Sequence, residues 1–204
     1  MRKARKPLCL LLCAVLLLSM SAAALGANNN YSSWFQTNYD EINKLGLMPA
    51  SFNGLDLTKD ITRGEMCELA VYAFEKATGN DIDMSNETFT GFTDTSNENI
   101  VKAHLYGIVN GYGSGLFGPN DPVTREQLAA ILYRYAVYGG MTAVTLEENL
   151  GSFADTAQLS AYAIQAMNWA VGQGLINGSG SNLVPKAQAT RAQVAAIIHR
   201  YLER

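Results

Sequence analysis

Three Thr-Arg pairs carry the residues of this chain best suited to chemistry, and each stands at the start of an amphipathic segment: Thr62-Arg63, Thr124-Arg125 and Thr190-Arg191. A guanidinium group is a planar fork of N–H donors that matches a carboxylate or a phosphate at two points. The first backbone N–H groups of a helix have no partner within the helix and also favour an anion. The pairs therefore raise the hypothesis of an anion-binding site built on helix starts.

The threonines have a simpler explanation, because a Glu or Gln follows each of them at the spacing of a capping box. Three such boxes are expected: Thr62 with Glu65, Thr124 with Gln127, and Thr190 with Gln193. Each cap contributes about 1 kcal/mol to stability. The arginines are not explained in this way, since a positive charge at a helix start is unfavourable. Residue chemistry leaves two interpretations open: an arginine that staples a loop of its own chain, and an arginine that holds a ligand.

A glycine-rich stretch, GYGSGLFGPN, precedes the second pair. Gly111 and Gly113 allow positive φ and a close approach of a ligand to the backbone, although a tight turn alone also accounts for them. Tyr112 offers a flat face on which a sugar ring could lie. The stretch does not fit a nucleotide-binding loop, because no buried strand precedes it and no Gly-Lys-Ser/Thr follows.

The chain repeats one unit three times, and this repetition predicts the fold. Each unit reads as a helix, an irregular loop and a second helix, with boundaries near residues 28–80, 88–140 and 150–204. The second helices carry apolar residues at i, i+3, i+4 and i+7, so each buries one stripe. We expect a mainly α fold in which the three second helices pack around a shared core. The linker after the second unit is expected to include a short helix.

Residues 1–27 have the order of a secretory signal peptide, with basic residues first, then an apolar run, then small residues. The apolar run is shorter than the roughly 20 residues that cross a bilayer, so we expect export without a transmembrane anchor after processing. Loss of this leader leaves 11 basic against 18 acidic residues, a net charge of −7. That charge disfavours nucleic acid as a partner.

The sequence predicts no catalytic activity, no metal site and no cofactor. His104 and His199 belong to no Ser-His-Asp or paired-carboxylate arrangement, and His199 is expected at an exposed position. Cys67 is expected to be a buried core residue, and one cysteine with two histidines does not complete a tetrahedral zinc site. Trp169 is expected in the core because it lies on the apolar face of its helix.

The middle copy, FTDT followed by GIVNGYGSGLFGPNDPVTREQLAAILYRYA, resembles an S-layer homology repeat. The pattern of that family is aromatic-x-Asp, a first helix, Gly-Tyr-x-x-Gly-x-Phe-x-Pro-Asn, and Thr-Arg-Ala-Glu at the head of a second helix. The third copy follows it well and the first more loosely. The resemblance implies a pseudo-threefold helical bundle, secreted to the cell wall of a Gram-positive-type bacterium. It implies non-covalent anchoring through secondary cell-wall polysaccharide, often pyruvylated, held in grooves between repeats.

The resemblance also implies roles for individual residues. Carried over by position, Arg63, Arg125 and Arg191 would pair with the pyruvate carboxylate, while Asp94 and Asp155 would accept hydrogen bonds from sugar hydroxyls. The loop that precedes Arg125 keeps the family pattern best, so this loop and Arg125 are expected to form the most competent site.

Further ligand contacts are expected from the backbone N–H groups of Gly111 and Gly113, from Tyr112, and from Trp34, which falls at the tryptophan of the family's first helix. The first copy lacks the aromatic-x-Asp opening and the glycine loop, and the third lacks the Tyr, Phe and Pro-Asn of the loop. Not all three grooves therefore need to bind. The alternative is a scaffold or coat that binds other envelope proteins without glycan, since the sequence shows no cargo domain for an anchor to display.

Overall fold

The computed structural model of the 204-residue chain describes residues 30–85, 89, 91–139 and 149–203. The expected signal peptide and the expected short helix of the second linker lie outside these residues. Within this part of the chain six α-helices follow one another: α1 (Gln36–Lys44), α2 (Arg63–Thr78), α3 (Glu98–Leu105), α4 (Arg125–Tyr138), α5 (Ile164–Gly172) and α6 (Arg191–Leu202). Four short 3-10 helices accompany them: η1 (Ser33–Phe35), η2 (Ala50–Phe52), η3 (Thr156–Gln158) and η4 (Ala161–Ala163). Pairing of extended backbone in the described part of the chain is limited to isolated bridges, so the prediction of a mainly α fold is confirmed.

The helices form three helix-loop-helix units, which we call unit 1 (α1 and α2), unit 2 (α3 and α4) and unit 3 (α5 and α6). Each unit's second helix begins at the capping box that its sequence predicts, and the box is complete in all three. In unit 2, for example, the Gln127 backbone N–H donates to Thr124 Oγ1, and Gln127 Oε1 accepts from the Thr124 N–H at 2.9 Å. These caps fix where α2, α4 and α6 start, and so they fix the position of each following arginine.

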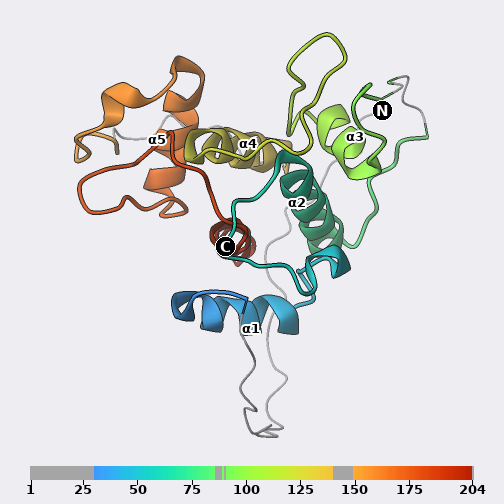
Figure 1. Ribbon diagram of the computed structural model, residues 1–204, viewed down its shortest axis with the longest axis horizontal. Coiled ribbons are helices and arrows are strands. Elements are labelled where there is room, and N and C mark those ends of the chain that lie inside the picture. The colour runs from blue at the N-terminus through green and yellow to red at the C-terminus, as the bar shows by residue number, and fades with distance from the viewer. Residues whose placement is uncertain (1–29, 86–88, 90, 140–148, 204) are drawn as a thin grey trace, which may run out of the picture.

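The units are interleaved rather than stacked. The helix α3 packs on α2, α5 packs on α4, and α1 packs on α6. Each first helix thus covers the second helix of the preceding unit, and the first unit covers the last. Figure 1 shows this closure, with α1 lying next to α6, the dark red helix beside the C label.

The three second helices meet in a shared core, as the apolar stripes predict. Residues from all of them line one small interior space: Met66, Ala70, Leu132, Tyr135, Ile198 and Tyr201. Cys67 and Trp169 are buried, which confirms both expectations, and burial raises the pKa of the Cys67 thiol to about 12. His199 is also buried, with 2% of its surface exposed. The expectation of an exposed His199 was wrong because α1 packs against α6 and covers it.

Three backbone hydrogen bonds close the bundle where the segments before the second helices meet. Ile61 N–H donates to Ala189 O (2.9 Å), Ala189 N–H donates to Val123 O (2.8 Å), and Val123 N–H donates to Ile61 O (3.1 Å). All three residues are fully buried. The bonds form a closed ring with one residue from each unit, which gives the bundle a pseudo-threefold centre.

Candidate functional site

Each of the three arginines reaches across to another unit. Arg63 of unit 1 donates from Nε to Phe117 O (3.1 Å) and from Nη2 to Asn110 O (2.8 Å), both in unit 2. Its guanidinium carbon lies 4.5 Å from the ring centre of Tyr112 and 4.4 Å from that of Phe117. We call this contact between Arg63 and residues 110–118 the first junction.

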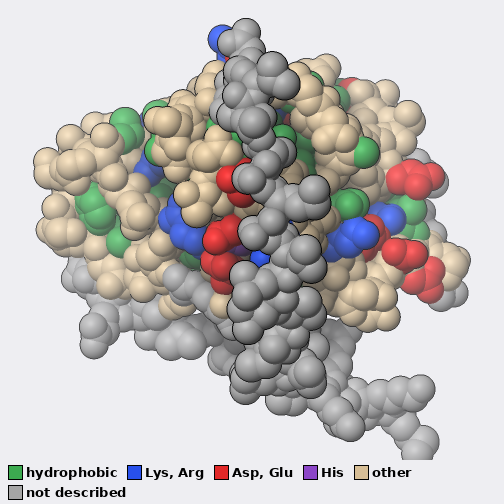
Figure 2. Space-filling model, turned by 90° about the horizontal axis from the view of Figure 1, so that it is seen from below, with side chains coloured by type: hydrophobic (Ala, Val, Ile, Leu, Met, Phe, Trp, Pro, Cys, Tyr) green, Lys and Arg blue, Asp and Glu red, His purple; other side chains and the backbone are tan. Residues whose placement is uncertain are grey.

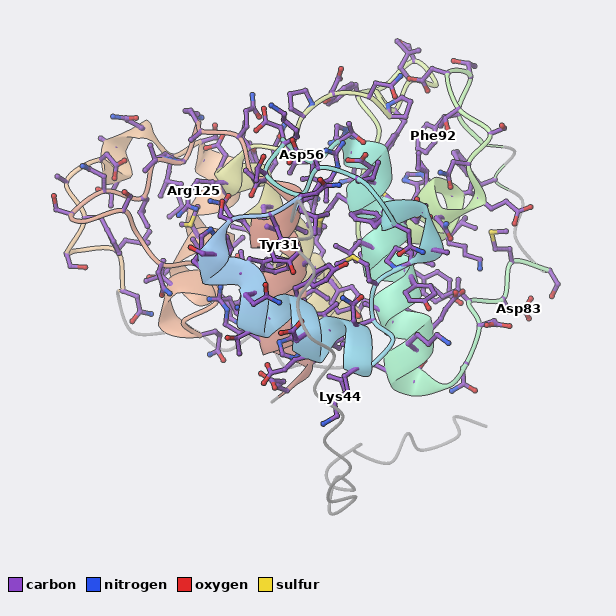
Figure 3. All side chains as sticks on the ribbon, turned by 60° about the horizontal axis from the view of Figure 1, so that its bottom comes forward. Tyr31, Lys44, Asp56, Asp83, Phe92 and Arg125 are labelled. Carbon is purple, nitrogen blue, oxygen red and sulfur yellow. The ribbon has the colours of Figure 1, made fainter. Side chains whose placement is uncertain are left out.

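The second junction repeats this arrangement between units 2 and 3. Arg125 donates from Nε to Leu183 O (2.8 Å) and from Nη2 to Asn177 O (2.7 Å), and the junction comprises Arg125 and residues 177–184. Figure 3 shows Arg125 among the loops of unit 3, whereas Phe92 lies on the opposite side of the view beside α3. Arg125 is half-buried, which leaves it more open to solvent than Arg63, of which 7% is exposed.

The third junction joins unit 3 back to unit 1 with different chemistry. Arg191 donates from Nε to Glu65 Oε2 (3.0 Å), from Nη2 to Glu65 Oε1 (2.7 Å) and from Nη1 to Asp56 O (3.0 Å). A carboxylate of the chain itself therefore occupies this guanidinium fork. The loop of unit 1 also lacks the glycine-rich sequence that the first junction carries.

These contacts correct the sequence-based pairing of arginines with loops. Arg125 was expected to converge with Gly111, Tyr112 and Gly113, the loop that precedes it in the sequence. In the structure Arg63 contacts that loop, whereas Arg125 contacts the loop of unit 3. The reason is the interleaving of the units, which places the start of each second helix against the following unit.

Asp94 and Asp155 hold the loops in shape. Asp94 accepts hydrogen bonds from the backbone N–H groups of Phe117 and Gly118, and Asp155 accepts from those of Leu183 (2.7 Å) and Val184 (2.8 Å). The bonds to these N–H groups lower the pKa of both carboxyl groups, although burial opposes the shift. The expected role toward sugar hydroxyls thus stays a prediction, next to a loop-positioning role that the sequence did not predict.

The aromatic residue of each aromatic-x-Asp opening explains one glycine of each loop. A Cβ built on Gly111 would lie 2.6 Å from Phe92 Cε1 and 2.7 Å from Leu116 O. In unit 3 a Cβ on Gly178 would lie 2.4 Å from Phe153 Cε1. The loops of units 2 and 3 therefore pack directly on these rings, and only glycine fits.

The remaining expected ligand residues are exposed. Tyr112 is 56% exposed, and Trp34, beside Phe35 at the start of unit 1, is 52% exposed. Within the described residues, the backbone N–H group of Gly111 makes no hydrogen bond, whereas Gly113 forms an antiparallel bridge with Leu116. The first junction thus brings Arg63, Tyr112 and these two glycines together, while Trp34 belongs to unit 1.

A polar cluster beside the second junction was missed by sequence reasoning. Glu126, which directly follows Arg125, is 4% exposed and accepts from Lys186 Nζ (2.6 Å), from the N–H and Oγ of Ser160 (3.0 Å each) and from Tyr162 Oη (3.3 Å). Burial would raise the pKa of Glu126, but the bonds from Lys186 and Ser160 outweigh it and lower this pKa. On the face of the molecule that Figure 2 shows, basic side chains of Lys and Arg likewise lie next to acidic side chains of Asp and Glu. No local spacing in the sequence pointed to this cluster, because its members come from two units.

Two segments of the chain, residues 92–129 and 152–195, match the family model of the S-layer homology domain. These segments are S-layer homology domains. Both run from the aromatic-x-Asp opening through the loop into the second helix. They therefore contain the aromatic ring and the aspartate that hold each loop, which are Phe92 and Asp94 in unit 2 and Phe153 and Asp155 in unit 3. The S-layer homology domain is a binding and anchoring module rather than a catalytic one, and its presence supports a location at the cell surface.

Several curated proteins are similar in sequence to this chain. The chain is 34% identical to exoglucanase XynX of Acetivibrio thermocellus over 72% of its own length and 13% of that protein. It is 36% identical to amylopullulanase of Thermoanaerobacterium thermosulfurigenes over 60% of the chain and 7% of that protein. It is 27% identical to the surface-layer 125 kDa protein of Lysinibacillus sphaericus over 90% of the chain and 15% of that protein. The chain thus spans less than a sixth of each relative. None of the helices that the structure describes has the length and hydropathy of a membrane span.

Proposed function

We propose that the chain anchors non-covalently to the bacterial cell wall by binding an acidic cell-wall polysaccharide, such as a pyruvylated glycan, at the first and second junctions. One observation carries the proposal. Arg63 and Arg125 are bound by neutral backbone carbonyl groups, and within the described residues neither forms an ion pair. Each guanidinium therefore brings a positive charge that no carboxylate of the described chain contacts directly, although Asp94 acts on Arg63 and Asp155 on Arg125 from a longer distance, and this suits an anionic substituent.

The first junction adds groups that suit a sugar. The exposed ring of Tyr112 offers an apolar face to a pyranose ring. The N–H groups of Gly111 and Gly113 are donors within the same loop as the carbonyl oxygens that hold Arg63. A carboxylate substituent of the sugar would gain charge-assisted hydrogen bonds from Nη1 of Arg63, which donates to no group among the described residues.

The third junction is proposed not to bind. Its arginine already holds Glu65 at two points, and an external carboxylate would have to displace that ion pair. Binding at the first two junctions also suffices for avidity, since two weak sites on one chain act together through their effective concentration.

Wall sacculi provide the test. The purified full chain is mixed with untreated sacculi and with sacculi from which hydrofluoric acid has removed the secondary polymer. We expect sedimentation with the untreated sacculi alone. Equal binding to both would overturn the proposal and favour an envelope-protein or peptidoglycan partner instead.

Substitutions at the second junction refine the test. Arg125→Ala is expected to weaken binding by about 1.5 to 3 kcal/mol, because a charge-assisted hydrogen bond is lost. Arg125→Lys keeps the charge but loses the fork, and is expected to bind with intermediate affinity. Arg200→Lys is the control for an arginine-to-lysine change, since Arg200 also donates to backbone carbonyl groups, those of Gly174 and Leu175, but contacts none of the residues that define the junction. Unfolding curves of all three variants separate lost affinity from lost stability.

A further inference from the structure

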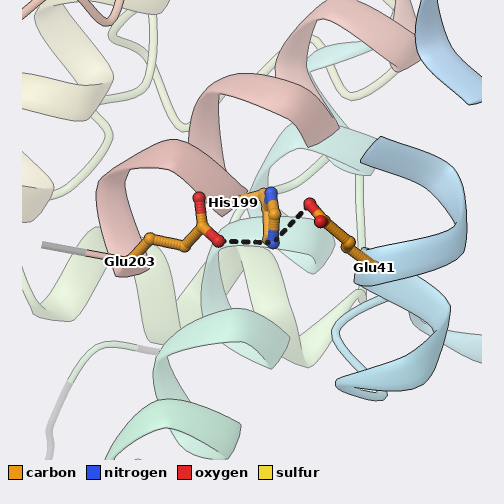
Figure 4. A group of neighbouring side chains, drawn as sticks. All are labelled: Glu41, His199 and Glu203. Carbon is orange, nitrogen blue, oxygen red and sulfur yellow. Dashed lines mark ion pairs between the residues drawn. The ribbon is translucent and has the colours of Figure 1, made fainter. Parts of the chain in front are cut away.

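We propose that Glu41, His199 and Glu203 form a binding site for a divalent transition-metal ion of the Zn²⁺ class. Each residue offers one ligand atom, and these atoms all lie within 4.8 Å of one another. Figure 4 shows both carboxylates directed at the same imidazole nitrogen, one from α1 and one from the end of α6. This inference is independent of the proposed glycan binding.

His199 is the reason to expect a ligand between these groups. Its side chain is 2% exposed, and among the described residues neither ring nitrogen has a hydrogen-bond partner. Buried polar atoms in folded proteins are nearly always hydrogen-bonded. Nε2 lies 3.5 Å from Glu203 Oε1 and 3.9 Å from Glu41 Oε2, which is longer than the roughly 2.7–3.2 Å of an N–H···O bond. The imidazole thus points at two carboxylates without bonding to either.

The spacing suits a metal ion better than a direct contact. In a tetrahedral zinc site with bonds of about 2.0–2.1 Å, the ligand atoms lie about 3.3 Å from one another. The two distances from Nε2 exceed this value by a few tenths of an ångström. The side chains of Glu41 and Glu203 are 53% and 54% exposed, so both are free to adjust and to leave an outward position for a water ligand.

The donor set also selects the type of ion. Two carboxylates balance the charge of a divalent cation, and the third ligand is an imidazole nitrogen. Ca²⁺ and Mg²⁺ take oxygen ligands, whereas Zn²⁺ and its neighbours in the first transition row bind imidazole well. The site is therefore expected to bind Zn²⁺ but not Mg²⁺.

A bound ion would join the two ends of the described fold. Glu41 lies on α1 of unit 1, while His199 and Glu203 lie on and just after α6 of unit 3. The ion would also relieve the repulsion between two carboxylates that approach one imidazole. Because the complete site exists only when α1 packs on α6, the ion stabilises the folded state by mass action.

Titration of the full chain with Zn²⁺, prepared without a histidine tag, tests the site directly. The chain has two histidines, so ¹⁵N-imidazole NMR separates them. His104, whose Nδ1 lies 3.2 Å from Val109 O, is the internal reference. We expect Zn²⁺ to shift the His199 resonances in the folded protein and leave those of His104 in place. At about 100 times Kd the Tm is expected to rise by roughly 5–10 °C, with no rise in Mg²⁺.

Glu41 and Glu203 are exposed, so we expect variants of these residues to fold. The test therefore does not depend on replacing the buried imidazole of His199. Glu41→Gln and Glu203→Gln are each expected to weaken Zn²⁺ binding by about 100-fold, since loss of a ligand costs at least as much as loss of an outer-shell partner. Glu98→Gln, on the exposed first turn of α3, is the matched control and is expected to leave affinity unchanged. Unchanged His199 resonances in Zn²⁺, or equal affinity of Glu41→Gln and Glu98→Gln, would overturn the proposal.

Discussion

Glu65 and Arg191 lie 126 residues apart in the sequence yet form a two-point ion pair, with Oε1 2.7 Å from Nη2 and Oε2 3.0 Å from Nε. The same Oε2 accepts the backbone N–H of Thr62 at 3.0 Å. One carboxylate therefore caps α2 and also holds unit 3 to unit 1. The corresponding positions in the other units are Gln127 and Gln193, whose amides cap their helices.

Replacing Glu65 separates these two roles. Glu65→Gln retains a capping amide, as in units 2 and 3, but removes the ion pair and leaves a partly buried Arg191 with Asp56 O. We expect the free energy of unfolding in urea to fall by about 1–3 kcal/mol. Glu98→Gln serves as the control for loss of an exposed charge. A Glu65→Gln protein as stable as this control would mean that the ion pair contributes nothing to closure.

The packing of Phe92 on the glycine loop predicts a specific steric effect. Gly111→Ala puts a methyl group against Phe92 Cε1 and Leu116 O, and overpacking of this kind costs about 1–3 kcal/mol. Gly151→Ala is the matched control, because no atom lies within 4 Å of its Cβ and its φ is not positive. We expect a lower Tm for the first variant and an unchanged or slightly higher Tm for the second. Equal Tm values for the two variants would show that the loop moves to accommodate the methyl group without a loss of stability.

Asp155 makes stability depend on pH. Burial would raise the pKa of its carboxyl group, but the N–H groups of Leu183 and Val184 outweigh burial and lower it below the unfolded value. A lowered pKa gives stability that is present above about pH 4 and is lost as the pH falls through the folded-state pKa. Asp155→Asn is therefore expected to lose about 1–2 kcal/mol at pH 7 and much less at pH 2–3. Urea unfolding at both pH values measures this, and a constant difference would contradict it.

Substitution of Tyr112 tests the proposed glycan site without replacing any of the arginines. Tyr112→Ala removes the exposed ring over Arg63, and we expect affinity for untreated sacculi to fall by about 0.5–1.5 kcal/mol. Tyr112→Phe keeps the ring and is expected to bind nearly as the wild type does. If both variants bind equally well, the ring makes no contact with the polymer.

Sequence reasoning succeeded where the information is local. The caps at Thr62, Thr124 and Thr190, and the burial of Cys67 and Trp169, follow from spacing within a single segment, and the structure confirms them. Helical periodicity likewise predicted the shared core.

Sequence reasoning failed where the contacts of a residue depend on how the three units pack against one another. Arg63 rather than Arg125 reaches the loop of unit 2, because each second helix starts against the following unit. His199 is buried by a helix that precedes it by some 155 residues. The contact of Glu126 with Lys186 likewise requires unit 3 to dock on α4. None of these relations has a local sequence signature.

The ring of hydrogen bonds between Ile61, Val123 and Ala189 has neither a first nor a last member. Deletion of any one unit removes two of its three bonds, so a two-unit fragment should not retain this centre. A circularly permuted chain that starts at unit 2 or unit 3 keeps all three. The number of units in this bundle is therefore fixed by closure, whereas an open array could be lengthened by adding another copy at either end.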